Sequence, residues 1–118
     1  QVGLLDERYF MYTEEMDLCY RLLKAGWRLY WVPQAAVVHH GEASSRQMAQ
    51  EMVIQLYRSK VQFHRKYGGD HRARVFKALL LLAYAPRWLI TRAGQASADH
   101  LAPRSRTYGR LIAQLPAM

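Results

Sequence analysis

Apolar side chains first recur at a helical spacing near the start of the chain. The i, i+3, i+4, i+7 positions are occupied by Met16, Cys19, Tyr20 and Leu23. Thr13 precedes them as a candidate N-cap whose hydroxyl can accept from a free backbone N–H of the first turn. Gly26 follows as a natural C-terminal stop. The pattern therefore predicts a helix over residues 14–25, with an apolar face turned to the core.

The next stretch changes to a strand-like pattern. Residues 27–32 alternate, with Trp27, Leu29 and Trp31 on one face, and Pro33 closes the run. Residues 35–40 are rich in valine and predict a second short strand. His39 and His40 must point to opposite faces if this strand is regular, so at most one of them faces a given site.

A helical pattern returns after residue 44. Ser44 and Gln47 form a capping-box pattern ahead of a basic amphipathic helix that Gly68 and Gly69 end. A second helical segment over 71–92 contains an apolar run that is too short to span a bilayer, which takes about 20 apolar residues. This segment could be an interfacial helix flanked by arginines or a core helix. Residues 94–106 predict a linker, and a last helix is expected over 108–115.

The composition narrows the class of protein. The chain has 118 residues, of which 51% are hydrophobic, so it is one domain or a piece of one. It begins without methionine and without a leader, and we expect it to be part of a longer sequence. The single Cys19 excludes an internal disulfide or a cysteine-rich zinc site. A reducing, cytoplasmic compartment fits best.

The net charge of +8 is unevenly spread along the chain. Residues 1–45 carry a net −2, whereas residues 46–118 carry +10. Such a basic part meets anionic membrane surfaces or nucleic acid. It has no nucleic-acid recognition motif, and its basic residues alternate with leucines rather than with stacking aromatics. We therefore expect an anionic membrane surface as a partner and no nucleic acid.

Three carboxylates stand at the predicted start of the first helix, namely Glu14, Glu15 and Asp17. A positioned carboxylate can act as a general base. The same residues also suit helix-start electrostatics, with Asp17 paired to Arg21 at i+4. From the residues alone, the electrostatic role is the simpler explanation.

A series of motifs in one order adds to this picture. They are Gly-Leu-Leu-Asp-Glu-Arg-Tyr-Phe at 3–10, Glu-Glu-Met-Asp-Leu-Cys at 14–19, Ala-Gly-Trp-Arg at 25–28, Val-Pro at 32–33 and Val-His-His-Gly at 38–41. Together they resemble the C-terminal half of family 2 glycosyltransferases, in particular the rhamnosyltransferase-like branch. The resemblance covers residues 3–45, and beyond them only the basic, helical character is similar.

The resemblance implies an α/β fold of the GT-A type, of which this chain would be a C-terminal fragment. It implies transfer, with inversion, from a nucleotide-sugar donor to a hydroxyl of a glycan or lipid-linked acceptor. Residues 1–45 would end the catalytic domain, 46–93 would form a basic helical extension, and 94–118 a linker with a possible terminal helix. The family's nucleotide-binding half is absent here, so we expect this piece alone to be inactive. We expect the whole protein to lie at the inner face of the plasma membrane.

The family motif also implies roles for single residues. The catalytic base falls on Glu15, where the family usually has Asp, and Glu14 and Asp17 are the alternatives. A divalent metal, Mn²⁺ or Mg²⁺, would be held mostly by the absent half, with His39 as a candidate ligand; a structural strand histidine is the other possibility.

Two residues, Arg21 and Trp27, are candidate substrate contacts. Trp27 and Trp31 could stack on a sugar, although core packing explains both tryptophans without further assumption. The competing function, of a different class, is a non-catalytic basic helical module that binds an anionic membrane surface.

Overall fold

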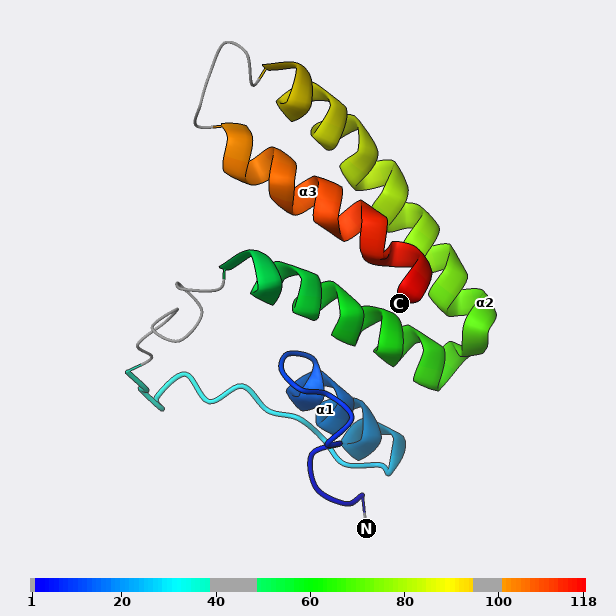
Figure 1. Cartoon of the computed structure of the whole chain (residues 1–118). Helices are drawn as coiled ribbons and strands as arrows, with labels where there is room; N and C mark the ends of the chain where they lie inside the picture. Colours follow the sequence, from blue (N-terminus) through cyan, green and yellow to red (C-terminus); the bar gives the residue numbers. More distant parts are fainter. Residues whose placement is uncertain (1, 39–48, 95–100) are drawn as a thin grey trace.

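The computed structural model describes residues 2–38, 49–94 and 101–118. All regular structure in these ranges is helical: α1 (Glu14–Lys24), α2 (Ala49–Gly94), α3 (Ala102–Gln114) and the short 3₁₀ helix η3 (Leu115–Ala117). Figure 1 shows α2 bent into two arms, with α3 lying along its second half and α1 beside its first half. The fold of the described residues is a small helical bundle.

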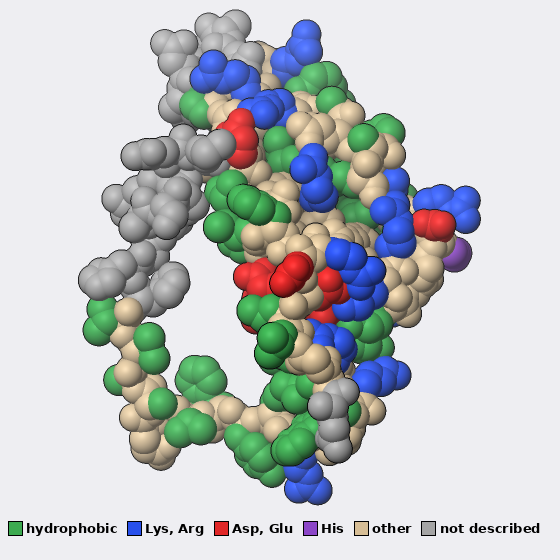
Figure 2. Space-filling view, turned by 60° about the horizontal axis from the view of Figure 1, so that its bottom comes forward, with side chains coloured by type: hydrophobic (Ala, Val, Ile, Leu, Met, Phe, Trp, Pro, Cys, Tyr) green, Lys and Arg blue, Asp and Glu red, His purple; other side chains and the backbone are tan. Residues whose placement is uncertain are grey.

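The expected α/β fold is therefore wrong for the described residues. Residues 27–38 form no strand, and the end of the second predicted strand, 39–40, lies outside the described residues. The alternating side chains suit a strand, but a strand also needs a neighbour for its backbone hydrogen bonds. No described segment pairs with this stretch, and its side chains stay exposed, Trp31 at 89%. Figure 2 shows an arm carrying hydrophobic side chains that stands away from the helices.

The first helix begins where the sequence predicts but buries a different face. Thr13 is the N-cap residue, yet it has a left-handed backbone (φ 76°) and its hydroxyl makes no capping hydrogen bond. Met16 and Leu23 are exposed, whereas Asp17 is fully buried. The helix docks through Tyr20, whose ring centroid lies 4.2 Å from that of Tyr67 on α2 and 5.6 Å from that of Phe63. The face of α1 that is buried is therefore the one that carries Asp17 and Tyr20, because their partners Lys66 and Tyr67 lie on α2.

The long helix α2 is broken at Gly69, as the Gly68-Gly69 pair predicts. Gly69 has φ 67° and ψ −175°, a conformation open essentially to glycine alone. The break lets the second half of α2 fold back, and the core forms between the two halves and α3. Its buried members are Ile54, Val61, Ala73, Leu80, Leu111, Leu115 and Met118.

Of the two alternatives for the 71–92 segment, the core helix is confirmed for one side, and the interfacial helix stays a prediction for the exposed side. Ala73 and Leu80 are buried in the core, whereas Leu82 and Ile90 are each 71% exposed. Within the described part of the chain, no helix is both long and apolar enough to cross a membrane.

The last helix is longer than the 108–115 range predicted for it. It starts at Ala102, with Pro103 in its first turn, where a missing N–H costs no helical hydrogen bond. The division into 1–45, 46–93 and 94–118 stays a prediction.

Candidate functional site

The carboxylate of Asp17 is the centre of a buried ionic cluster at the junction of α1 and α2. Its Oδ1 accepts from Lys66 Nζ at 2.6 Å and from the Tyr67 hydroxyl at 2.7 Å. Its Oδ2 accepts from Arg21 Nε at 2.8 Å. The Tyr9 hydroxyl lies 3.4 Å from Oδ1 and adds a longer hydrogen bond. Both oxygens of the buried carboxylate are therefore satisfied within the protein.

A second acid extends this cluster to the N-terminal segment. Lys66 Nζ also contacts Asp6 Oδ2 at 2.8 Å, so one ammonium group bridges two carboxylates. Asp6 in turn accepts from the Arg8 guanidinium at 2.7 Å. The Ser59 hydroxyl donates to the Met11 carbonyl at 2.8 Å, which fixes the same segment to α2 a short way along the helix.

The pKa values of the cluster follow from these contacts. Burial alone raises the pKa of Asp17, but the hydrogen bonds from Lys66, Tyr67 and Arg21 outweigh it and leave the pKa below its ordinary value. Burial opposes the charge on Lys66 as well, yet its bonds to the two aspartates raise its pKa. Burial raises the pKa of Tyr9 to about 12, with the charge of Asp17 adding to the effect. At neutral pH the aspartate and lysine are charged and the phenol is neutral.

Two of the sequence-predicted site residues are committed to this cluster. Asp17 has no accessible side-chain surface, and Arg21 keeps 20% of its own. The three guanidinium nitrogens of Arg21 are all engaged: Nε by Asp17, Nη1 by the carbonyl of Val2 and Nη2 by the carbonyl of Leu4, at 2.6 Å. The arrangement ties the N-terminal segment to α1 and uses three of the five N–H donors of Arg21 within the protein.

The other two carboxylates of the motif lie outside this cluster. Glu15 is exposed, whereas Glu14 is partly buried and its Oε2 is buried without accepting a hydrogen bond from the described residues. Figure 2 shows a group of acidic side chains near the middle of one face, next to lysine and arginine side chains, with other acidic side chains further away. Of the three candidate bases, Glu15 is therefore the one whose carboxylate a second molecule can reach most directly.

The remaining predicted site residues lie apart from the cluster. Trp27 follows α1 and is 57% exposed, and Trp31 lies further along the same arm. His39 lies outside the described residues. In the described ranges no group of three or more His, Cys, Asp or Glu side chains could hold a metal ion. The described residues thus do not by themselves make a site for the expected divalent metal.

Sequence reasoning missed most partners of Asp17. The i+4 pairing with Arg21 can be read from the helix pattern, and the 2.8 Å ion pair confirms it. Lys66 and Tyr67 lie 49 and 50 residues away, on a helix whose packing against α1 no local pattern indicates. In the sequence, nothing distinguishes Lys66 from the other basic residues of its amphipathic helix, so its contact with Asp17 could not be predicted.

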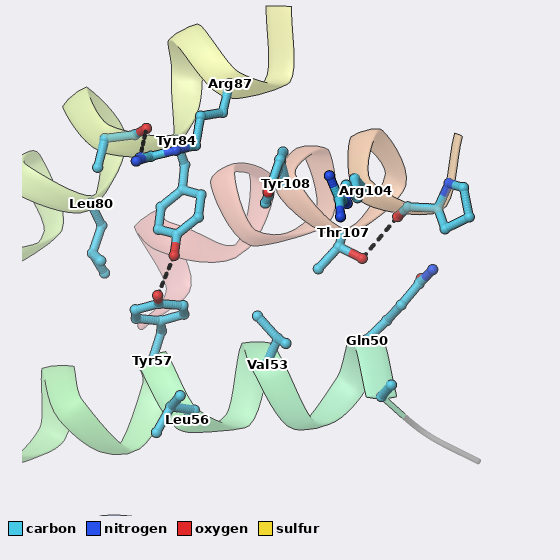
Figure 3. Close-up of a pocket in the computed structure, with 13 residues that line it drawn as sticks. Gln50, Val53, Leu56, Tyr57, Leu80, Tyr84, Arg87, Arg104, Thr107 and Tyr108 are labelled. Atoms are coloured by element: carbon cyan, nitrogen blue, oxygen red, sulfur yellow. Dashed lines mark hydrogen bonds between the residues drawn. The ribbon is translucent and has the colours of Figure 1, made fainter. Parts of the chain in front are cut away.

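A separate pocket of about 800 Å³ opens between the two halves of α2 and α3. Its walls are largely aliphatic and aromatic, and Figure 3 shows Tyr57 and Tyr84 meeting across it through their hydroxyls. Burial, together with the hydrogen bond between Tyr57 and Tyr84, raises the pKa of Tyr57 to about 12, so the phenol is neutral at pH 7. Arg87 and Arg104 also line this pocket. None of the sequence-predicted site residues does.

Comparison with known proteins finds short similarities to rhamnosyltransferases. A stretch of 40 residues, 34% of this chain, is 62% identical to the N-acetylglucosaminyl-diphospho-decaprenol L-rhamnosyltransferase of Mycobacterium tuberculosis strain H37Rv. A stretch of 46 residues, 39% of the chain, is 44% identical to the rhamnosyltransferase WbbL of Escherichia coli strain K12. The chain spans only 13% and 17% of the lengths of these relatives. No family model matches the chain, and no solved structure matches it.

Proposed function

We propose that this chain is part of a glycosyltransferase that moves a sugar of the rhamnosyl class from a nucleotide-sugar donor to a lipid-linked or glycan hydroxyl. The observation that carries the proposal is the stretch of 40 residues that is 62% identical to an L-rhamnosyltransferase acting on N-acetylglucosaminyl-diphospho-decaprenol. Identity at that level over a contiguous stretch supports a shared role for those residues. The activity belongs to the whole protein, of which the chain would supply one part.

The chemistry proposed for this part is general base catalysis by Glu15. In an inverting transfer a carboxylate takes the proton of the acceptor hydroxyl while the oxygen of that hydroxyl attacks the anomeric carbon. The bond from this carbon to the nucleoside diphosphate breaks at the same time, and the diphosphate leaves with the electron pair. Asp17 is a poor candidate because both its oxygens are engaged within the protein. Glu15 stands two residues away, on the first turn of the helix that Asp17 anchors, and is exposed. Glu14 is the second choice.

The ionic cluster would serve this base by holding the start of α1 in place. Base catalysis is sensitive to misplacement by about 1 Å. The side chain of Asp17 is fixed by groups from three segments, the N-terminal segment, α1 and α2. We propose that Asp17 and Arg21 are positioning residues, and that any Mn²⁺ or Mg²⁺ is held mainly by the rest of the protein. A peripheral location at the inner face of the plasma membrane, where a lipid-linked acceptor is at hand, is part of the same proposal.

The test is a transfer assay on the whole protein that carries this chain, with nucleotide-activated L-rhamnose and a polyprenyl-diphospho-N-acetylglucosamine acceptor. Glu15→Gln removes the base while keeping the size of the side chain, so kcat should fall by roughly 10² to 10⁴ fold. Donor affinity, measured by calorimetry, should stay unchanged. Glu15→Asp should keep part of the rate, because a carboxylate remains.

The control is Asp70→Asn, which removes an exposed carboxylate outside the motifs at 3–41. It should leave kcat as it is. A full rate in Glu15→Gln would remove Glu15 as the base, and the same assay on Glu14→Gln would then decide between the two neighbours. No sugar transfer by the unaltered whole protein would overturn the proposed function itself.

A further inference from the structure

The second half of α2 carries an apolar stripe that the bundle does not cover. Its large side chains are all about half exposed or more: Val75 48%, Leu79 57%, Leu82 71%, Leu89 58% and Ile90 71%. At 100° per residue these positions fall on one side of the helix, opposite the buried Leu80 and Tyr84 side. Figure 1 shows the second half of α2 at the edge of the bundle, with α3 along its inner side. The stripe is therefore an outward face.

The charges around this stripe have one sign. Residues 71–94 contain no aspartate or glutamate but five basic residues: Arg72, Arg74, Lys77, Arg87 and Arg92. By helical position, Arg72 and Arg87 lie toward one side of the stripe, and Arg74 and Arg92 toward the other. Trp88 has the guanidinium of Arg92 5.2 Å from the centre of its ring, but it lies on the other side of the helix, toward Gly109 of α3. An apolar stripe edged by arginines is the composition of helices that lie in a membrane interface.

The charges around the stripe favour a lipid bilayer over a second copy of the chain as the partner that covers it. A spacing of four and three residues, as in Val75, Leu79 and Leu82, could equally form the seam of a helix pair. In a pair of copies, however, the arginines on the two edges would face arginines, with no acidic residue in 71–94 to offset them. An anionic bilayer offers the opposite charge along the whole face, while the aliphatic stems of the arginines can lie along the apolar edge.

We propose that the outer face of residues 75–90 of α2 binds the surface of an anionic lipid bilayer, with the helix lying in the plane of the membrane. This extends the proposed function by naming a partner surface, and rests on it only for the expectation that a lipid-linked acceptor is met at a membrane. The binding itself needs no donor, acceptor or catalysis. It can therefore be tested separately from transfer.

The experiment is vesicle flotation of the purified chain, with vesicles of phosphatidylglycerol and phosphatidylcholine compared with vesicles of phosphatidylcholine alone. The chain should float with the anionic vesicles at low salt and less so at high salt. The triple variant Leu79→Gln/Leu82→Gln/Leu89→Gln should lower the partition coefficient at least about tenfold, because it removes most of the apolar stripe. Circular dichroism of each variant checks that its helix content matches that of the parent.

The matched control is Leu4→Gln/Leu5→Gln/Leu23→Gln. It removes three leucines that are 90%, 51% and 54% exposed, away from the second half of α2. It should float like the parent. An equal loss of flotation in both triple variants, or no binding of the parent to anionic vesicles at low salt, would overturn the proposal. So would a dimer of the parent in analytical ultracentrifugation that only the α2 variant abolishes, since a second copy would then occupy the stripe.

Discussion

At the scale of single residues, the neighbourhood of each carboxylate decides what it can do. Glu14, Glu15 and Asp17 are chemically similar and lie within four positions. Asp17 points into the junction with α2 and meets Lys66, while Glu15 points outward. Two positions, about half a helical turn, thus separate the buried charge of Asp17, which holds the structure together, from the exposed charge of Glu15, which another molecule can reach. The sequence motif marks all three alike, because helical position alone does not reveal which side will be buried.

The first prediction concerns the stability that Asp17 provides. Asp17→Asn leaves the ammonium of Lys66 and the guanidinium of Arg21 partly buried without this counter-charge. Removing one partner of a buried ion pair costs about 3 to 5 kcal/mol, so the free energy of unfolding in urea should fall by that order. Asp70→Asn is the control, because its pair with Arg65 is exposed and such pairs contribute about 0 to 1 kcal/mol. Equal losses in the two variants would contradict the structural role of the cluster.

The second prediction is the pH dependence of this contribution. The pKa of Asp17 in the folded state lies below its ordinary value of 3.8, because hydrogen bonds from Lys66, Tyr67 and Arg21 overcome the effect of burial. A depressed folded pKa stabilises the protein above the unfolded pKa, and this stabilisation is lost as the pH falls through the folded value. The unfolding free energy should therefore drop steadily below about pH 4. The drop should be shallower in Asp17→Asn than in Asp70→Asn, although Asp6 will still contribute to it.

At the scale of elements, the sequence predicts the helices correctly, but it also predicts strands that the described residues do not form. The start of α1, the break at Gly69 and the existence of a last helix follow from caps, glycines and periodicity, which are local signals. A strand also depends on a neighbour that may be far away in the chain. Residues 27–32 alternate as a strand should, yet no described residue pairs with them. The same holds for the candidate site: the sequence predicts the i+4 pair of Asp17 with Arg21, but it does not predict the contact of Asp17 with Lys66.

The third prediction concerns the break in α2. Gly69 combines φ 67° with ψ −175°, which an L side chain adopts only at a cost of about 1 to 3 kcal/mol. Gly69→Ala should therefore lower the midpoint of thermal unfolding, even though no atom lies within 4 Å of the added methyl group. Ala93→Gly, in an exposed turn of the same helix, should cost no more than about 1 kcal/mol. A Gly69→Ala variant as stable as the parent would mean that α2 can run straight through this position.

At the scale of the whole molecule, two sets of contacts hold different parts together. Core residues such as Val61 and Leu111 join the two halves of α2 to α3. The N-terminal segment and α1 are held to α2 chiefly by the cluster around Asp17, by the Tyr20 contacts and by the bond from Ser59 to Met11. The sequence reveals the amphipathic patterns behind the first set. The second depends on contacts some 50 residues apart, which a single sequence does not indicate.

The fourth prediction follows from this division. An isolated helix of 11 residues is marginal in water, since helices shorter than about 12 to 15 residues rarely hold by themselves. Once Asp17→Asn weakens its attachment, α1 should lose amide protection in hydrogen exchange, while α3 keeps most of its own. Leu111→Ala should do the reverse, because a fully buried leucine leaves a cavity that costs about 2 to 5 kcal/mol where α3 meets α2. If each variant instead lowered protection uniformly over both regions, the molecule would unfold as one unit, and the cluster could not hold the start of α1 independently of the core.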